Sequence, residues 1–137
     1  MRKVIRSQDA PQPRGVYSQA IESDGFVFVS GQGPVNPLTN QLETGNFKSQ
    51  VRQTLRNIER ILEAAGSSLR EVTRLGVFLA DLNDFGSLNE VFREFFPDNP
   101  PARTTVGAQL PLPQMKVEID CIARRRENRF KRPSAKS

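Results

Sequence analysis

The sequence predicts a two-layer α+β fold in which helices cover one face of a single sheet. Residues 47–65 place apolar side chains at three- and four-residue steps, which is the period of an amphipathic helix. Shorter segments on both sides of it are rich in Val, Ile and Phe and end at turn residues, as strands do. With 137 residues the chain suits one domain with one core, and the predicted order is β-β-β-α-β-α-β-β.

The first part of the chain predicts a hairpin. Val16–Ile21 and Phe26–Val29 have strand composition and are joined by Glu22-Ser23-Asp24-Gly25. Asp-Gly favours a tight hairpin because both residues tolerate a positive φ. Lys3–Arg6 could add a short strand before it. The second strand ends at Ser30-Gly31-Gln32-Gly33, which is either a backbone cradle for an anion or simply the exit from a strand.

A loop over residues 34–46 leads to the first helix, predicted over Phe47–Ala65. Asn46 can cap its start, and Gly66 fits the position after its end. The apolar stripe faces the predicted core. The opposite face is polar and has a structural role only; it consists of Arg52, Arg56, Asn57, Glu59 and Arg60.

The second half of the chain adds one strand, one helix and two further strands. The strand is predicted over Val72–Ala80. Asp84 could cap the helix, which ends at Phe96-Pro97. The helix is expected to bury Phe85, Leu88, Phe92 and Phe95. The last two strands are predicted over Arg103–Gly107 and Met115–Ala123.

The last strand indicates that both faces of the sheet are covered. Met115, Val117, Ile119, Cys121 and Ala123 alternate along it and fit the core beneath the helices. The other parity mixes Glu118 and Asp120 with Ile122, and other strands are apolar on both parities. Two helices cover only one face. We therefore expect self-association to cover the other.

Composition excludes several kinds of chemistry. The chain has no histidine and one cysteine, so a Ser-His-Asp or Cys-His nucleophile is impossible, and we expect no zinc or haem site. No dense Asp/Glu spacing suggests another metal. The polar N-terminus and the lack of an apolar run of about 20 residues predict a cytoplasmic protein without a membrane partner.

The positive net charge is concentrated at the C-terminal end. Residues 124–137 have seven basic residues and one acidic residue, whereas the rest of the chain has 13 basic and 14 acidic residues. We expect a domain over residues 1–123 and a basic, disordered tail over residues 124–137. A solvated end explains the tail better than a nucleic-acid-binding arm does.

Arg103 and Glu118 are the strongest candidates for chemistry. Arg103 begins a strand at the rim of the sheet, where its planar fork could bind a carboxylate, with Thr105 on the same face. Glu118 could act as a general base if partial burial tunes its pKa. A structural ion pair between Arg103 and Glu118 is the competing interpretation. Tyr17 is expected at a core edge and Cys121 inside the core.

The chain resembles the YjgF/RidA family of reactive-intermediate deaminases from about Ile5 to Arg124. The match depends on many short motifs in one order and spacing. They include Asp9-Ala10-Pro11, Gly15-Val16-Tyr17-Ser18-Gln19-Ala20, Val29-Ser30-Gly31-Gln32-Gly33-Pro34, Gln53-Thr54-Leu55-Arg56-Asn57-Ile58, Leu62-Glu63-Ala64-Ala65-Gly66, Val77-Phe78-Leu79-Ala80-Asp81-Leu82-Asn83-Asp84-Phe85, Asn89, Phe95-Phe96, Pro101-Ala102-Arg103-Thr104 and Val117-Glu118-Ile119-Asp120-Cys121-Ile122-Ala123.

The resemblance implies a chorismate-mutase-like fold assembled as a homotrimer with a central barrel and with ligand sites between subunits. It implies hydrolysis of enamines and imines such as 2-aminoacrylate and 2-aminocrotonate to 2-keto acids and ammonia, without a cofactor. The imines would come from pyridoxal-phosphate-dependent dehydratases. A non-catalytic carboxylate-binding trimer and an RNA-binding or endoribonuclease-like activity stay open as alternatives.

The resemblance also implies roles for individual residues. Arg103 would bind the substrate carboxylate, Glu118 would orient the water, and Tyr17 would line the pocket. Further substrate contacts would come from Ser30, Gly31, Asn89 and Thr105. Thr105 departs from the family pattern, because many members have cysteine there. A main-chain role at this position would make the loss of the thiol unimportant.

Overall fold

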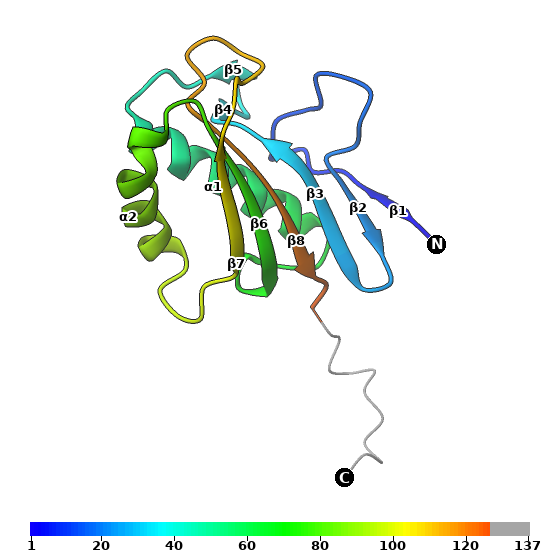
Figure 1. Ribbon diagram of the computed structural model, residues 1–137. Helices are drawn as coiled ribbons and strands as arrows, with labels where there is room; N and C mark the ends of the chain where they lie inside the picture. The colour runs from blue at the N-terminus through cyan, green and yellow to red at the C-terminus, as the bar shows by residue number, and fades with distance from the viewer. Residues whose placement is uncertain (127–137) are drawn as a thin grey trace.

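One mixed six-stranded sheet organises the described part of the chain, in the strand order β1-β2-β3-β8-β6-β7 (Figure 1). The computed structural model describes residues 1–126. The sheet strands are β1 (Lys3–Ile5), β2 (Ala20–Ser23), β3 (Phe26–Gln32), β6 (Val72–Leu79), β7 (Ala102–Gly107) and β8 (Val117–Arg124). The remaining elements are the hairpin β4 (Val35–Asn36) and β5 (Gln41–Leu42), the helices α1 (Phe47–Ala64) and α2 (Phe85–Phe95), and the 3-10 turns η1 (Leu69–Glu71) and η2 (Leu82–Asp84).

The hairpin of β2 and β3 forms at the predicted turn. Asp24 and Gly25 have φ angles of 52° and 81°, so both adopt the left-handed conformation that Asp-Gly permits. The first strand is shorter than predicted, because Val16–Gln19 is loop and β2 begins at Ala20. The ladder between β2 and β3 ends at Ala20 and Val29, and from Val29 to Gln32 the register of β3 against β8 shifts.

Helix α1 confirms the predicted start and both caps, and it ends at Ala64, one residue before the predicted end. The Asn46 side chain accepts a hydrogen bond from the Ser49 backbone N–H at 2.9 Å, and Gly66 has a φ of 76°. The prediction for Asn57 was wrong, because this side chain is completely buried. It donates to backbone carbonyls of the β3–β4 connection, so a polar residue is satisfied inside the core.

Helix α2 differs from its prediction in its cap and its buried face. Asp84 precedes the helix but makes no side-chain capping bond, whereas Asp81 accepts from the Asn83 backbone N–H in the turn before it. Phe85 is exposed and Phe95 is only partly buried. The first turn at Phe85 lies outside the core, whereas Phe95 packs against the core from its edge. Its buried residues are Leu88, Val91 and Phe92.

The last two strands do not pair with each other. Strand β6 lies between them, parallel to β7 and antiparallel to β8. Because a parallel pair needs a crossover connection, α2 links β6 to β7 across the helical face. Arg103 is therefore paired with Leu75 on β6, and Glu118 with Phe78 on the same strand.

The two faces of the sheet differ as the last strand predicted. Met115 and the alternate residues Val117, Ile119, Cys121 and Ala123 are buried in the core on the side of the helices. Burial, with a smaller contribution from Asp120, raises the pKa of the Cys121 thiol to about 12, so this thiol stays protonated and is structural.

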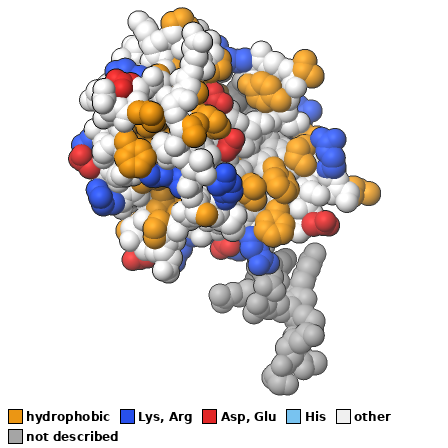
Figure 2. Space-filling model, viewed as in Figure 1, with side chains coloured by type: hydrophobic (Ala, Val, Ile, Leu, Met, Phe, Trp, Pro, Cys, Tyr) orange, Lys and Arg blue, Asp and Glu red, His pale blue; other side chains and the backbone are white. Residues whose placement is uncertain are grey.

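The opposite face, here called the open face, carries no helix (Figure 1). Phe26 and Phe28 on β3 are 38% and 43% exposed, and Val106 on β7 is also exposed. Hydrophobic side chains gather on this face over the lower part of β3 (Figure 2). Exposed aromatic side chains on a sheet face are typical of an interaction surface. Self-association stays a prediction.

The basic segment after Ala123 begins on the folded domain. Arg124 is the last residue of β8, and the Arg125 and Arg126 backbone N–H groups donate to Gly25 and Gly66 carbonyls. Residues 127–137, which hold most of the expected tail, lie outside the described residues. Within residues 1–126, no helix combines the length and the hydropathy that crossing a membrane requires.

Candidate active site

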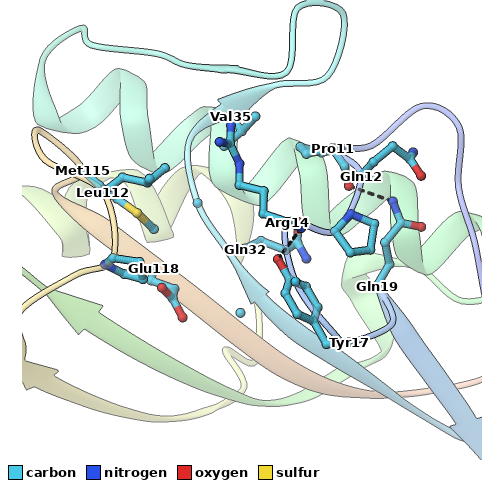
Figure 3. Close-up of a pocket in the computed structure, with 15 residues that line it drawn as sticks. Pro11, Gln12, Arg14, Tyr17, Gln19, Gln32, Val35, Leu112, Met115 and Glu118 are labelled. Carbon is cyan, nitrogen blue, oxygen red and sulfur yellow. Dashed lines mark hydrogen bonds between the residues drawn. The ribbon is translucent and has the colours of Figure 1, made fainter.

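A cavity of about 290 Å³ opens beside the end of β3. Its walls come from the loop over residues 11–17, from the β3–β4 connection and from the loop before β8. Figure 3 shows Glu118 and Met115 on one side of the opening and Tyr17, Arg14 and Gln19 on the other. Most of its lining is apolar, as in ordinary small-molecule sites. The surface is visibly hollowed beside the upper end of β3 (Figure 2).

Glu118 reaches this cavity because Gly31 leaves room for it. A Cβ atom on Gly31 would overlap the Glu118 carboxylate, and it would lie 3.0 Å from the carboxyl carbon. The glycine is therefore required by close approach. Gly76 on β6 makes room for Asp120 in the same way. Two carboxylates of β8 thus lie on the open face over glycines of the flanking strands.

Partial burial raises the pKa of Glu118, and the neighbouring charge of Asp120 raises it further. A carboxylate with a raised pKa is a stronger base than an ordinary surface glutamate. A group of this kind, with access to a cavity, meets the requirement for a general base or a water-orienting group.

Tyr17 lines the cavity, although it lies in a loop and not on the strand where the sequence predicted it. It is 48% exposed, and its hydroxyl accepts a hydrogen bond from the Arg14 backbone N–H at 3.1 Å. Ser30 has a different position from Gly31. Its hydroxyl donates to the Ser18 carbonyl at 2.6 Å, so it holds the Tyr17 loop against β3.

Arg103 lies at a second cavity, between α2 and β7. Its guanidinium carbon is 5.3 Å from the centre of the Phe85 ring and 5.2 Å from that of Phe92. Stacking on the two rings fixes the guanidinium group while its N–H groups stay available. Partial burial lowers the pKa of Arg103, but an arginine side chain remains charged in this environment.

Asn89 and Thr105 accompany Arg103 on this side of the sheet. Asn89 on α2 lines the same cavity of about 290 Å³ as Arg103. Thr105 is paired with Val77 on β6 and is half-buried. Among the described residues its Oγ1 has no hydrogen-bond partner. Buried hydroxyls are normally satisfied, so this oxygen is an exception among the described residues.

The two strongest candidates lie on opposite faces of the sheet. Arg103 shares the helical face with its partner Leu75, whereas Glu118 alternates with the buried Val117 and Ile119 and so faces the open side. In residues 1–126 no carboxylate lies within 4 Å of the Arg103 guanidinium. The ion pair between Arg103 and Glu118 is therefore not present in the described chain.

Three buried amide side chains position the cavity walls, and none was recognised from the sequence. Gln19 bonds Ser7 and Pro11, Gln50 bonds Gln114 and Lys116, and Asn57 bonds Gly33 and Val35. Each ties one wall of the cavity to the core. In the sequence, Gln50 and Asn57 stand next to the apolar stripe of the first helix. This position could have indicated that their side chains are buried. No group of three potential metal ligands occurs among the residues the structure describes.

Known proteins share this fold and sequence over most of the chain. The family model described as endoribonuclease L-PSP matches residues 7–125. A RutC family protein of Pyrococcus horikoshii is 45% identical over 123 residues, covering 90% of this chain and 98% of that protein. The 2-iminobutanoate/2-iminopropanoate deaminase of Rattus norvegicus is 39% identical over 123 residues, covering 90% of each chain.

Solved structures agree with the sequence comparison. RidA from an Antarctic Psychrobacter is 40% identical with a TM-score of 0.85, covering 89% of this chain and 98% of the other. E. coli TdcF with bound serine is 37% identical with a TM-score of 0.84, covering 90% and 99%.

The mixed sheet with two helices on one face is thus the α+β fold of the RidA structures. The chain belongs to the RidA/YjgF/L-PSP family, as the family model and the identities near 40% show.

Proposed function

We propose that this protein is a cofactor-free deaminase that hydrolyses 2-imino acids to 2-keto acids and ammonia, working as a homotrimer. The family includes proteins named 2-iminobutanoate/2-iminopropanoate deaminase. A related structure with bound serine supports a small amino-acid-like ligand. We expect the substrates to be small enamines and imines such as 2-aminoacrylate.

In the proposed reaction, water adds to the imine carbon and ammonia then leaves. Glu118 orients the water and accepts a proton from it as the carbon–oxygen bond forms. Glu118 passes this proton to the imine nitrogen, which gives a carbinolamine. The carboxylate then moves the hydroxyl proton of the carbinolamine to the amino nitrogen, so that the carbonyl forms, ammonia leaves and Glu118 is again ionised. Arg103 binds the substrate carboxylate in two parallel hydrogen bonds. Tyr17 and the backbone at Gly31 shape the pocket, while Asn89 and Thr105 flank the arginine.

The observation that carries this proposal is the separation of the two half-sites. Glu118 lies in the cavity on the open face, and Arg103 offers unpaired N–H groups at the edge strand β7. Neither half is complete by itself. A second copy that covers the open face could bring its Arg103 to the cavity of Glu118, which supports a site between subunits and an assembly of the family's trimeric kind.

The test couples the protein to a pyridoxal-phosphate-dependent serine dehydratase, which releases 2-aminoacrylate, and measures ammonia and pyruvate above spontaneous hydrolysis. We expect Arg103→Ala and Glu118→Gln each to lower kcat/KM by roughly 100-fold. Wild-type rates in Arg103→Ala would overturn the assignment of the carboxylate-binding residue.

Binding measurements beside this assay separate the alternatives. A carboxylate-binding trimer would bind pyruvate saturably without accelerating the release of ammonia. An RNA-binding protein would show affinity that falls steeply with salt. The deaminase is favoured because Glu118 has a raised pKa inside a cavity whose lining is mostly apolar.

A further inference from the structure

Arg14 brings a second positive charge to the proposed active site. Among the described residues that line the Glu118 cavity, Arg14 and Glu118 are the charged ones. The proposed reaction uses Glu118 but assigns nothing to Arg14. The α-carboxylate of the substrate is already assigned to Arg103 of a second copy.

The Arg14 side chain is held in place from both ends. Its backbone N–H donates to the Tyr17 hydroxyl at 3.1 Å. Its guanidinium Nη2 donates to the Asn40 carbonyl at 2.6 Å, and Asn40 has a φ of 58° in the turn between β4 and β5. This hydrogen bond places the exposed guanidinium group at the cavity rim in the absence of ligand, and such an orientation lowers the entropic cost of binding.

Most donors of this guanidinium group remain available. An arginine side chain has five N–H donors, and the structure records one of them in use. Within residues 1–126 no carboxylate lies at ion-pair distance from Arg14. In Figure 3 the side chain runs along the wall opposite Glu118 towards Val35. An exposed guanidinium group at the rim of a mostly apolar cavity, with no carboxylate partner among the described residues, is suited to bind a carboxylate.

We propose that Arg14 makes the site selective for 2-imino acids with a second carboxylate on the side chain, which Arg14 binds while Glu118 faces the imine carbon. This inference rests on the proposed deaminase function and names its substrate class. The reaction for a five-carbon example is 2-iminoglutarate plus water giving 2-oxoglutarate plus ammonia. The cavity of about 290 Å³ has room for more than the three carbons of 2-aminoacrylate.

The test compares two substrates of equal chain length. An amino-acid oxidase generates 2-iminoglutarate from glutamate and 2-iminopentanoate from norvaline, and the accelerated release of each keto acid is measured. We expect the wild-type protein to prefer 2-iminoglutarate by roughly two- to five-fold in kcat/KM, as one ion pair near solvent allows. The preference should shrink at high salt because such a pair is screened.

Arg14→Gln is the informative variant. Glutamine keeps a polar amide but removes the charge. The preference should disappear because the reaction of 2-iminoglutarate slows more than that of 2-iminopentanoate. Arg60→Gln is the matched control, because Arg60 also donates to a backbone carbonyl, that of Asp9, yet does not line the cavity. This control should keep the preference.

Different outcomes separate this inference from the proposed function. If Arg14→Gln lowers kcat/KM equally for both substrates, Arg14 does not bind the second carboxylate. An unchanged preference would show the same. Either result leaves the deaminase intact. If the wild-type protein accelerates the hydrolysis of neither imine, calorimetry compares its affinities for 2-oxoglutarate and 2-oxopentanoate. An Arg14-dependent preference then supports dicarboxylate recognition without deamination, and its absence overturns both proposals.

Discussion

At the scale of single residues, the Glu118 carboxylate can occupy its position because residue 31 is a glycine. The space that a Cβ atom of Gly31 would need is occupied by the carboxylate itself. The conflict involves the far end of a flexible side chain and not the backbone. A larger residue at this position should therefore displace Glu118 without unfolding the protein.

We expect Gly31→Ala to lower kcat for imine hydrolysis by roughly 10- to 100-fold, because a small displacement of a catalytic group is costly. The thermal transition should change little. Gly86→Ala is the matched control: a Cβ atom there meets nothing within 4 Å, and the helix α2 should tolerate or favour alanine. Full activity of Gly31→Ala would show that the Glu118 carboxylate is not needed where the structure has it.

The ionised form of Glu118 also destabilises the folded protein, so the contribution of this side chain to stability depends on pH. Its pKa is raised in the folded protein, first by burial and then by Asp120, so the folded state favours the protonated form. The favourable contribution is present below the pKa of the unfolded chain, about 4.3, and is lost as pH rises through the folded pKa. At neutral pH the ionised Glu118 carboxylate therefore destabilises the folded state relative to the unfolded chain.

Glu118→Gln should consequently raise the melting temperature at pH 7 while it lowers the proposed activity. The difference from the wild-type protein should vanish near pH 4, where both side chains are neutral. Asp120→Asn removes the neighbouring charge that raises the pKa of Glu118. The pH below which activity is lost should therefore be lower in this variant than in the wild-type protein. A melting temperature difference that stays constant from pH 4 to pH 7 would contradict this account.

At the scale of elements, the buried amides connect the secondary structure to the cavity walls. Asn57 on α1 donates to the Gly33 carbonyl at 3.1 Å and to the Val35 carbonyl at 2.8 Å. Its own oxygen accepts from Gln53. The segment that contains Gly31 is thereby held to the longest helix of the described chain, so the helix takes part in positioning the site.

Asn57→Ala should cost about 2 to 3 kcal/mol of unfolding free energy, because it removes two hydrogen bonds and leaves buried carbonyls unsatisfied. Urea unfolding at a fixed protein concentration measures this cost. The KM for imine substrates should rise as the cavity wall loosens. Gln53→Ala is the control, since it removes only one partly buried bond and should cost less than about 1 kcal/mol. Equal costs for the two variants would show that the backbone bonds of Asn57 contribute little.

Local sequence patterns predicted the elements better than their arrangement. The caps at Asn46 and Gly66 and the Asp24-Gly25 turn depend on neighbouring residues, so they could be predicted. The insertion of β6 between β7 and β8 depends on pairing between distant segments, which alternation does not encode. Polar residues such as Asn57 were assigned to solvent because their buried partners are backbone groups that composition cannot reveal.

The candidate site was predicted in its parts. Alternation along the last strand correctly separated Glu118 from the core, and the segment Pro101-Ala102 correctly left Arg103 at the edge of the sheet. Their closeness within one chain could not be tested by such patterns, because β7 and β8 were not known to be separated by β6. Arg14 was missed because a lone arginine in a proline-containing loop has no distinguishing pattern.

At the scale of the whole molecule, an uncovered sheet face and a divided candidate site both favour self-association. The open face leaves Phe26 and Phe28 exposed, and the half-sites of Arg103 and Glu118 lie on opposite faces of one sheet. A homotrimer in which each open face meets the edge strand of a neighbour would cover the phenylalanines and complete three sites at once. A site that draws its two charged groups from different chains makes a quantitative prediction.

That prediction is complementation between two inactive variants. Arg103→Ala and Glu118→Gln are mixed in equal amounts, unfolded and refolded together, so that subunits assemble at random. If a site takes Arg103 from one chain and Glu118 from the next, about a quarter of the sites contain both native residues, and about a quarter of wild-type activity should return. Each variant refolded alone, and the two mixed without unfolding, are the controls. If both residues instead act within one chain, no combination of these subunits holds an intact site, and activity in the refolded mixture should stay at the level of the separate variants.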